Sequence, residues 1–234
     1  MKTALRFFVV SSAALASLLG AQTTPLRIEQ TVEAQFPHAL SLSPITEGEA
    51  RVIINVDADG KLADWLVTGY TDKAFADEAV TVLKAWRYTP AMDRGQPIGV
   101  RMELKFQFEA KGRVISLMAI ETPEVLHKMM GLGQAFVTTV SNLSDLDRPL
   151  AAVNPESPRY PAGVAATASR SVLVDFYVDE KGQPRMPVVI NSSHENFSLA
   201  AVDALSRWRF TAPTRDGKPV AVRVRQEFIF PTRS

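Results

Sequence analysis

The segment from Asn191 to His194 places two serine hydroxyls beside a histidine, a combination that could supply a nucleophile and a base. A catalytic nucleophile needs a base and an orienting acid that converge in space, and neighbouring positions in one segment do not provide this. The Gly-x-Ser-x-Gly turn that exposes a serine nucleophile in one large class of hydrolases does not occur. We therefore expect no catalytic residues and no enzyme activity, and predict that Ser193 or Asn196 caps a helix.

The histidines do not form a metal-binding pattern. His38, His127 and His194 are far apart in the sequence and lack the paired spacing of a metal site. The chain has no cysteine and no acidic calcium loop, which leaves no disulfide, no thiol chemistry and no obvious ion site. We expect neither a metal nor another cofactor.

Two arginines near the end of the chain could bind an anionic partner. Arg223 and Arg225 are two residues apart in a predicted strand, so their side chains share a face. They could form a cationic rim that favours acidic peptides, or simply a solvated strand face that resists aggregation. The formal net charge of the chain is only +1, which does not suggest nucleic acid as a partner.

The sequence contains an internal repeat. Trp86-Arg87-Tyr88, Gly95 and Phe108 reappear 122 residues later as Trp208-Arg209-Phe210, Gly217 and Phe230. Further upstream the register slips by two, because Phe36-Pro37 matches Tyr160-Pro161. One constant offset over such a span indicates a duplication and predicts two small domains.

Each copy has the pattern strand, strand, helix, strand. Alternating apolar residues predict strands over 51–57, 62–68 and 100–108, and again over 172–179, about 184–190 and 220–230. Helical spacing from Phe75 to Trp86 and from Phe197 to Trp208 predicts one amphipathic helix per copy, the first capped by Asp72. The expected fold class is α+β, with two tandem small domains, each a three-stranded antiparallel sheet with one helix packed on it. Pro184 and Pro187 indicate that the strand they flank lies at an edge or is bulged.

The amino-terminal segment and the region between the copies have their own patterns. Lys2 and Arg6 precede an apolar run to Ala21, which predicts a signal peptide over residues 1–21. An uncleaved anchor is the alternative, and only then would the protein contact a membrane. Residues 111–157 are predicted to hold a helix that begins at Thr122-Pro123-Glu124, followed by a proline-containing linker.

The second copy, residues 158–234, resembles the TonB carboxy-terminal domain. The resemblance lies in Tyr160-Pro161, the run from Val188 to Ser193, Trp208-Arg209-Phe210 and Gly217-Lys218-Pro219-Val220, with Leu146-Asp147-Arg148-Pro149 as a similar lead-in. The first copy, residues 36–110, is a degenerate version, with Thr68-Gly69-Tyr70 where the second has Ile190-Asn191-Ser192.

The resemblance implies a periplasmic protein of energy-coupled transport. Domains of this family bind a short peptide of an outer-membrane transporter, which adds as a strand beside the last strand of the sheet. The corresponding edge residues here are Val222, Arg223, Val224, Arg225, Gln226 and Phe228. We assign binding to the second domain, because only Pro231 to Ser234 follow its last strand, whereas Glu109 to Met118 could cover the edge of the first. We expect Val224→Pro or Gln226→Pro to abolish binding.

An alternative reading gives the domains a structural role. In that case the protein is a periplasmic scaffold whose sheet edges mediate self-association, for example as a homodimer, or contacts with other envelope proteins. Both readings use a sheet edge, so the sequence does not separate them.

Overall fold

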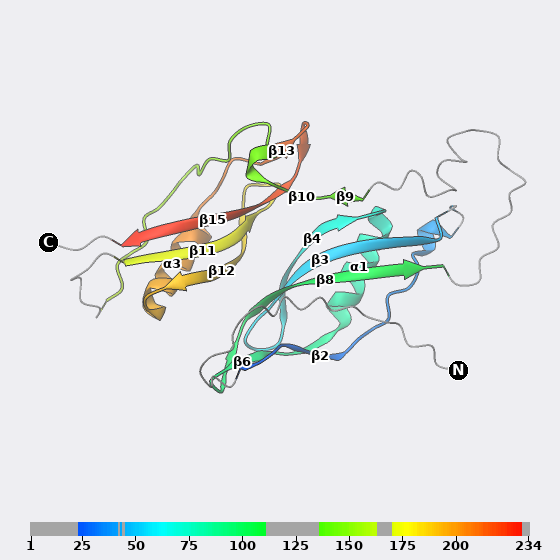
Figure 1. Cartoon of the computed structure of the whole chain (residues 1–234), viewed down its shortest axis with the longest axis horizontal. Helices are drawn as coiled ribbons and strands as arrows, with labels where there is room; N and C mark the ends of the chain where they lie inside the picture. The colour runs from blue at the N-terminus through cyan, green and yellow to red at the C-terminus, as the bar shows by residue number, and fades with distance from the viewer. Residues whose placement is uncertain (1–22, 42, 44, 111–135, 163–169, 231–234) are drawn as a thin grey trace, which may run out of the picture. The chain divides into compact units, whose positions relative to one another are not determined.

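The computed structural model describes residues 23–41, 43, 45–110, 136–162 and 170–230 (Figure 1). The chain divides into two compact units between Thr138 and Thr139. The predicted signal peptide and the helix predicted from Thr122 lie outside the described residues. Within the described ranges, no helix is both long and apolar enough to cross a membrane.

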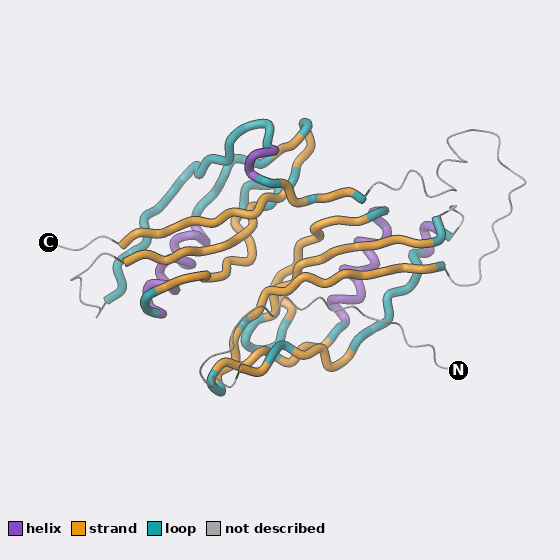
Figure 2. The backbone as a smooth tube through the Cα atoms, in the orientation of Figure 1, coloured by secondary structure: helices purple, strands orange, loops and turns teal. Residues whose placement is uncertain are grey.

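The first unit contains a four-stranded sheet with one helix on it (Figure 2). Its strand order is β8-β3-β4-β9, and every pairing in this sheet is antiparallel. The elements are β3 (Glu47–Val56), β4 (Leu62–Tyr70), α1 (Lys73–Ala85), β8 (Val100–Glu109) and β9 (Val137–Thr138). The predicted three strands and helix are confirmed, and β9 adds a short fourth strand.

Shorter elements complete this unit. A 3-10 helix, η1 (His38–Leu40), precedes β3. Strand β2 pairs with β5, and β1, β6 and β7 form a small three-stranded sheet. Their bounds are β1 (Thr23–Thr24), β2 (Arg27–Gln30), β5 (Arg87–Thr89), β6 (Ala91–Asp93) and β7 (Gln96–Ile98).

Strand β9 is held by an aromatic anchor. The ring of Phe136 lies over Gly69, where an added Cβ would be 2.4 Å from ring atoms, and the Arg51 guanidinium lies 4.7 Å from the ring centroid. A side chain at position 69 would therefore displace the ring. The departure of the first copy from the second at Gly69 thus has a structural reason, since it makes room for Phe136.

The second unit repeats the same arrangement with a different fourth strand. Its sheet order is β10-β15-β11-β12, in which β15 pairs antiparallel with β11 and parallel with β10. The elements are β10 (Val140–Ser141), η3 (Leu143–Asp145), β11 (Arg170–Val178), β12 (Pro184–Ser192), α3 (Glu195–Arg207), β13 (Thr214–Arg215), β14 (Lys218–Pro219) and β15 (Ala221–Phe230). Strand β12 is an edge strand with register shifts against β11, as its prolines predict.

The core of the second unit follows from its alternating pattern. The side chains of β11 that point toward α3 are fully buried and meet one apolar face of that helix. The members of this cluster include Val172, Val174, Phe176 and Val178 from the strand and Phe197, Ala201, Ala204 and Leu205 from the helix. The turn after β11 requires glycine, because Gly182 has φ +76° and an added Cβ would lie 2.0 Å from the Phe210 carbonyl oxygen.

The two helices begin in equivalent ways. Asp72 caps α1 as predicted, because its Oδ1 accepts a hydrogen bond from the Ala74 N–H at 2.9 Å. The prediction for α3 is wrong: the cap is His194, whose Nδ1 accepts from the Asn196 N–H at 3.1 Å. His194 lies 122 residues after Asp72, so the repeat offset identifies the cap although histidine is not a preferred capping residue.

Candidate functional site

Strand β15 is open along most of one side. It pairs with β11 from Val222 to Phe230. On its other side, Ala221 and Val222 are the positions that pair with a described strand, β10. From Val224 to Ile229, no strand among the described residues pairs with this side. An unpaired strand edge offers N–H and C=O groups to another chain.

The direction of the backbone groups along this edge is fixed by one hydrogen bond. The Ala221 N–H donates to the Thr139 carbonyl oxygen at 2.9 Å, which places the Ala221 amide on the β10 side. Backbone groups alternate sides along a strand, and the pairing of β15 with β11 is unbroken. The N–H groups of Arg225, Glu227 and Ile229 therefore point to the open edge.

All six predicted edge residues lie on β15, where they have different environments. The side chains of Val222, Val224 and Phe228 are buried in the core, and Gln226 is half-buried, with its Nε2 donating to the Glu227 carbonyl oxygen at 2.7 Å. Because even-numbered residues direct their N–H groups to β11, proline at 224 or 226 would disrupt the sheet itself. These two variants are therefore unsuitable tests of binding at the edge.

Arg223 and Arg225 converge on a buried carboxylate. Asp175 lies on β11 directly opposite Arg225 and is 0% exposed. The Arg223 Nε and Nη2 donate to its two oxygens at 2.9 and 3.1 Å, and the Arg225 Nε donates at 3.2 Å. The hydrogen bonds that Arg223 donates to Asp175 raise the pKa of the Arg223 guanidinium.

This cluster retains one positive charge close to the open edge. The two arginine side chains are 50% and 63% exposed, so they can still meet a partner. The structure orients both arginine side chains through Asp175, a contact that neither a solvated strand face nor a cationic rim had included. By formal charge, two arginines and one aspartate sum to +1.

Sequence reasoning missed Asp175. The alternation that identified Val172, Val174 and Phe176 as core residues assigned no role to the opposite face of the strand. An acidic residue inside the largely apolar run from Val172 to Val178, opposite two arginines in the same predicted sheet, was the available signal. The first copy has Ile53 at the equivalent position, so this cluster belongs to the second unit alone.

Residues 146–156, here called the lead-in, precede the first main strand of the second unit and are hydrogen-bonded to that unit at two places. At the first, Asp147 donates its N–H to the Thr214 carbonyl oxygen, and its carboxylate accepts from the N–H groups of Gly217 and Asp216 at 3.0 and 2.8 Å. The hydrogen bond from Gly217 is the main cause that lowers the pKa of the Asp147 carboxyl. The leucines on either side, Leu146 and Leu150, pack against the core.

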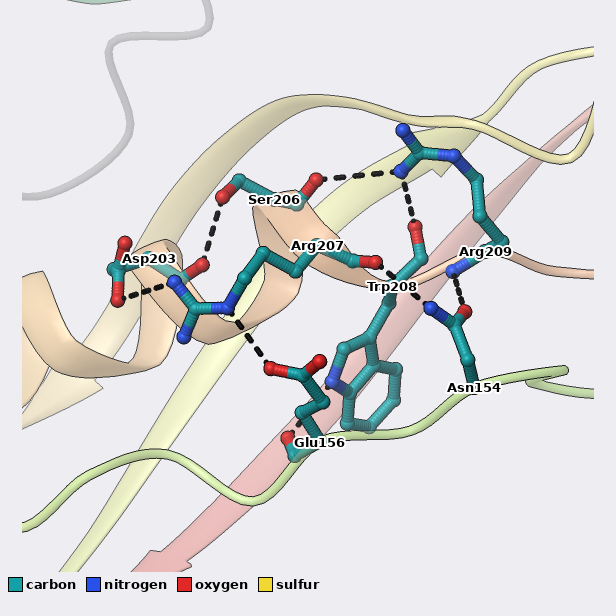
Figure 3. A network of polar contacts seen from close by, with 7 residues as sticks. All are labelled: Asn154, Glu156, Asp203, Ser206, Arg207, Trp208 and Arg209. Carbon is teal, nitrogen blue, oxygen red and sulfur yellow. Dashed lines mark hydrogen bonds and ion pairs between the residues drawn. The ribbon is translucent and has the colours of Figure 1, made fainter.

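The second fastening is at the end of α3 (Figure 3). The Asn154 side chain accepts from the Arg209 N–H at 2.7 Å and donates to the Arg207 carbonyl oxygen at 3.2 Å. The indole N–H of Trp208 donates to the Glu156 carbonyl oxygen at 2.9 Å. The tryptophan at the end of the helix is therefore a structural residue that holds this segment, and its ring also packs against Phe228 of β15 at 5.2 Å between centroids.

Comparison with known families agrees with this arrangement. The model of the C-terminal domain of the Gram-negative bacterial TonB protein matches residues 41–110 and, a second time, residues 156–232. These two segments make up more than half of the chain, so the chain belongs to this family and contains two tandem copies of its domain. No curated protein matches the chain.

Proposed function

We propose that this TonB-like protein binds a peptide segment of an outer-membrane transporter in the periplasm, by addition of the peptide as a strand to β15. The observation that carries the proposal is the run from Val224 to Ile229, whose outward N–H and C=O groups pair with no described strand. A peptide that lies along this run would extend the sheet, with main-chain hydrogen bonds as its source of affinity. Family membership supports the same mode of recognition.

The charge cluster supports a preference for acidic peptides. Asp175 holds the guanidinium groups of Arg223 and Arg225 on the face beside the edge, and these three residues have a formal charge of +1. An acidic side chain on the incoming strand would meet this charge across the strand pair. Oppositely charged cross-strand pairs contribute modestly to affinity but favour one register over others.

A scaffold role for the sheet edges is the second candidate. In the first unit, β8 is also an edge strand, and among the described residues only β3 pairs with it. The Ala110 N–H donates to the Thr46 carbonyl oxygen, so the odd-numbered residues of β8 point their N–H groups to its open side. A second copy of the chain could pair with either edge.

A matched pair of proline variants distinguishes the two edges. Glu227 and Lys105 occupy equivalent positions, 122 residues apart, and both direct their N–H to the open side. A labelled peptide with the sequence features of a transporter TonB box is titrated against the full chain, Glu227→Pro and Lys105→Pro. Proline at an edge position with a solvent-facing N–H is tolerated by the sheet.

We expect Glu227→Pro to weaken binding at least about tenfold, since a ladder hydrogen bond is lost and the strand edge is reshaped, and Lys105→Pro to have no effect. Loss of binding only in Lys105→Pro would move the site to the first unit. Peptide binding to none of the three proteins, together with concentration-dependent dimers, would favour the scaffold role.

A further inference from the structure

The chain already places one of its own strands on the edge of β15. Val140 and Ser141 form β10, which pairs in parallel with Ala221 and Val222. The hydrogen bond from the Ala221 N–H to the Thr139 carbonyl oxygen lies on the same side of β15 as the open run. Strand β10 therefore occupies the first positions of the edge to which we assign peptide binding.

Strand β10 is attached weakly. Its register with β15 extends over two residue pairs. Ser141 is 5% exposed, and its Oγ has no hydrogen-bond partner among the described residues. A buried hydroxyl without a partner loses its hydration and gains nothing in return, so it opposes the closed arrangement.

The preceding strand, β9, has side-chain contacts that stabilise its attachment. Phe136, directly before β9, fills the space that Gly69 leaves open and receives the Arg51 guanidinium on its ring. Strand β9 thus has an aromatic anchor on its own sheet, whereas β10 carries a buried polar group that destabilises its attachment. Of these two consecutive strands, β10 is the one that can be displaced.

Displacement would be limited to a short segment. On the carboxyl side of β10, Asp147 is bound to the β13–β14 turn through Gly217 and Asp216. Release of β10 therefore leaves the lead-in in place, and the strand stays close to its site. A tethered competitor of this kind has a high effective concentration.

We propose that β10 is an internal competitor for the peptide-binding edge of β15, which an incoming peptide must displace to pair along the whole strand. This inference rests on the function proposed above for β15. The apparent affinity for peptide is then the intrinsic affinity reduced by the fraction of molecules in which β10 is released. Variants that loosen β10 should bind peptide more tightly, and variants that tighten it should bind less tightly.

Two substitutions at one residue change this balance in opposite directions. Ser141→Val replaces the unpartnered hydroxyl with an apolar side chain that favours strands, and so tightens β10. The Thr139 carbonyl group faces β15, so by alternation the backbone groups of Ser141 also face β15 and those of Val140 face away. Ser141→Pro therefore removes an N–H that faces β15. Val140→Pro is the matched control, because it removes an N–H on the far side.

The experiment combines amide hydrogen exchange without peptide and titration of the labelled peptide, on the full chain and the three variants. We expect the Ala221 amide to exchange faster in Ser141→Pro and slower in Ser141→Val. Peptide affinity should rise about tenfold in Ser141→Pro and fall about threefold or more in Ser141→Val, as the released fraction changes, with little change in Val140→Pro.

The possible failures are distinguishable. Equal peptide affinity in all four proteins would overturn the internal competitor while leaving the binding function of β15 intact. Unchanged exchange of the Ala221 amide in Ser141→Pro would also overturn it, because the strand would not have been released. Absence of binding in every protein, including Ser141→Pro, would reject the proposed function and the inference with it.

Discussion

At the scale of single residues, Asp175 determines how the charged side chains beside β15 are arranged. Its carboxylate is fully buried and accepts hydrogen bonds from Arg223 and Arg225. Removing one partner of a buried ion pair usually costs several kcal/mol, because the other charge is left without compensation. Here both arginines are at least half exposed, so water compensates part of the loss.

We expect Asp175→Asn to lower the free energy of unfolding of the second unit by about 1–3 kcal/mol, measured by urea denaturation. The control is Asp203→Asn, which removes an exposed i, i+4 pair with Arg207 and should cost under about 0.5 kcal/mol. Equal losses of unfolding free energy in the two variants would mean that the burial of Asp175 adds nothing to the stability of the second unit.

Asp147 makes the attachment of the lead-in dependent on pH. The hydrogen bond from the Gly217 N–H lowers the pKa of the Asp147 carboxyl in the folded protein. A depressed pKa means that the attachment stabilises fully above the ordinary pKa of aspartate, about 3.9, and is lost as the pH falls through the folded-state value. The amide resonance of Gly217 should therefore titrate with a midpoint below about 3.9. Asp147→Asn should abolish that transition, and a midpoint at or above the ordinary value would contradict the attachment.

At the scale of elements, one side of strand β15 pairs with β11 and the other side is open. Adjacent residues of β15 direct their N–H groups to opposite sides. The Gln226 N–H points to β11 inside the sheet, and the Glu227 N–H points to the open edge. We expect Gln226→Pro to lower the free energy of unfolding by about 1–3 kcal/mol through loss of a ladder hydrogen bond, and Glu227→Pro to change it by much less. Thermal or urea unfolding of both variants tests this. The reverse order would place the alternation in the opposite phase and would move the docking groups to the even-numbered residues.

At the scale of the whole molecule, the second unit begins at Thr139, before residue 156, where the match to the family model starts. Strand β10, the Asp147 bonds and the packing of Leu146 and Leu150 all precede residue 154 and belong to this unit. A fragment of residues 139–234 should fold cooperatively, and residues 154–234 should be less stable by roughly 2–4 kcal/mol, from the buried apolar area lost with the two leucines. Comparison of their urea unfolding curves decides this, since equal stabilities would show that the lead-in contributes nothing.

The sequence predicted the parts of the fold that depend on local periodicity. Alternation and helical spacing identified the three main strands and the helix of each unit, because those patterns record which face is buried. Short strands such as β9 and β10 were not predicted, since two residues are too few for a period and their pairing depends on distant chain.

The candidate site was only partly predictable for the same reason. The residues of β15 could be named from the resemblance, but the phase of its backbone groups needed the Ala221–Thr139 hydrogen bond. The role of Asp175 needed the register between β11 and β15, which no local pattern contains.

The indole hydrogen bonds have a consequence for the history of this chain. Trp86 donates its indole N–H to the Val32 carbonyl oxygen, and Trp208 donates its own to that of Glu156. The tryptophans are 122 residues apart and the acceptors 124, which is the slip seen between Phe36 and Tyr160. The ancestral unit that was copied therefore already included the segment that now contains Val32 or Glu156, together with its contact with the helix. The two-residue length difference arose afterwards, by an insertion or deletion between that segment and the first strand of the main sheet.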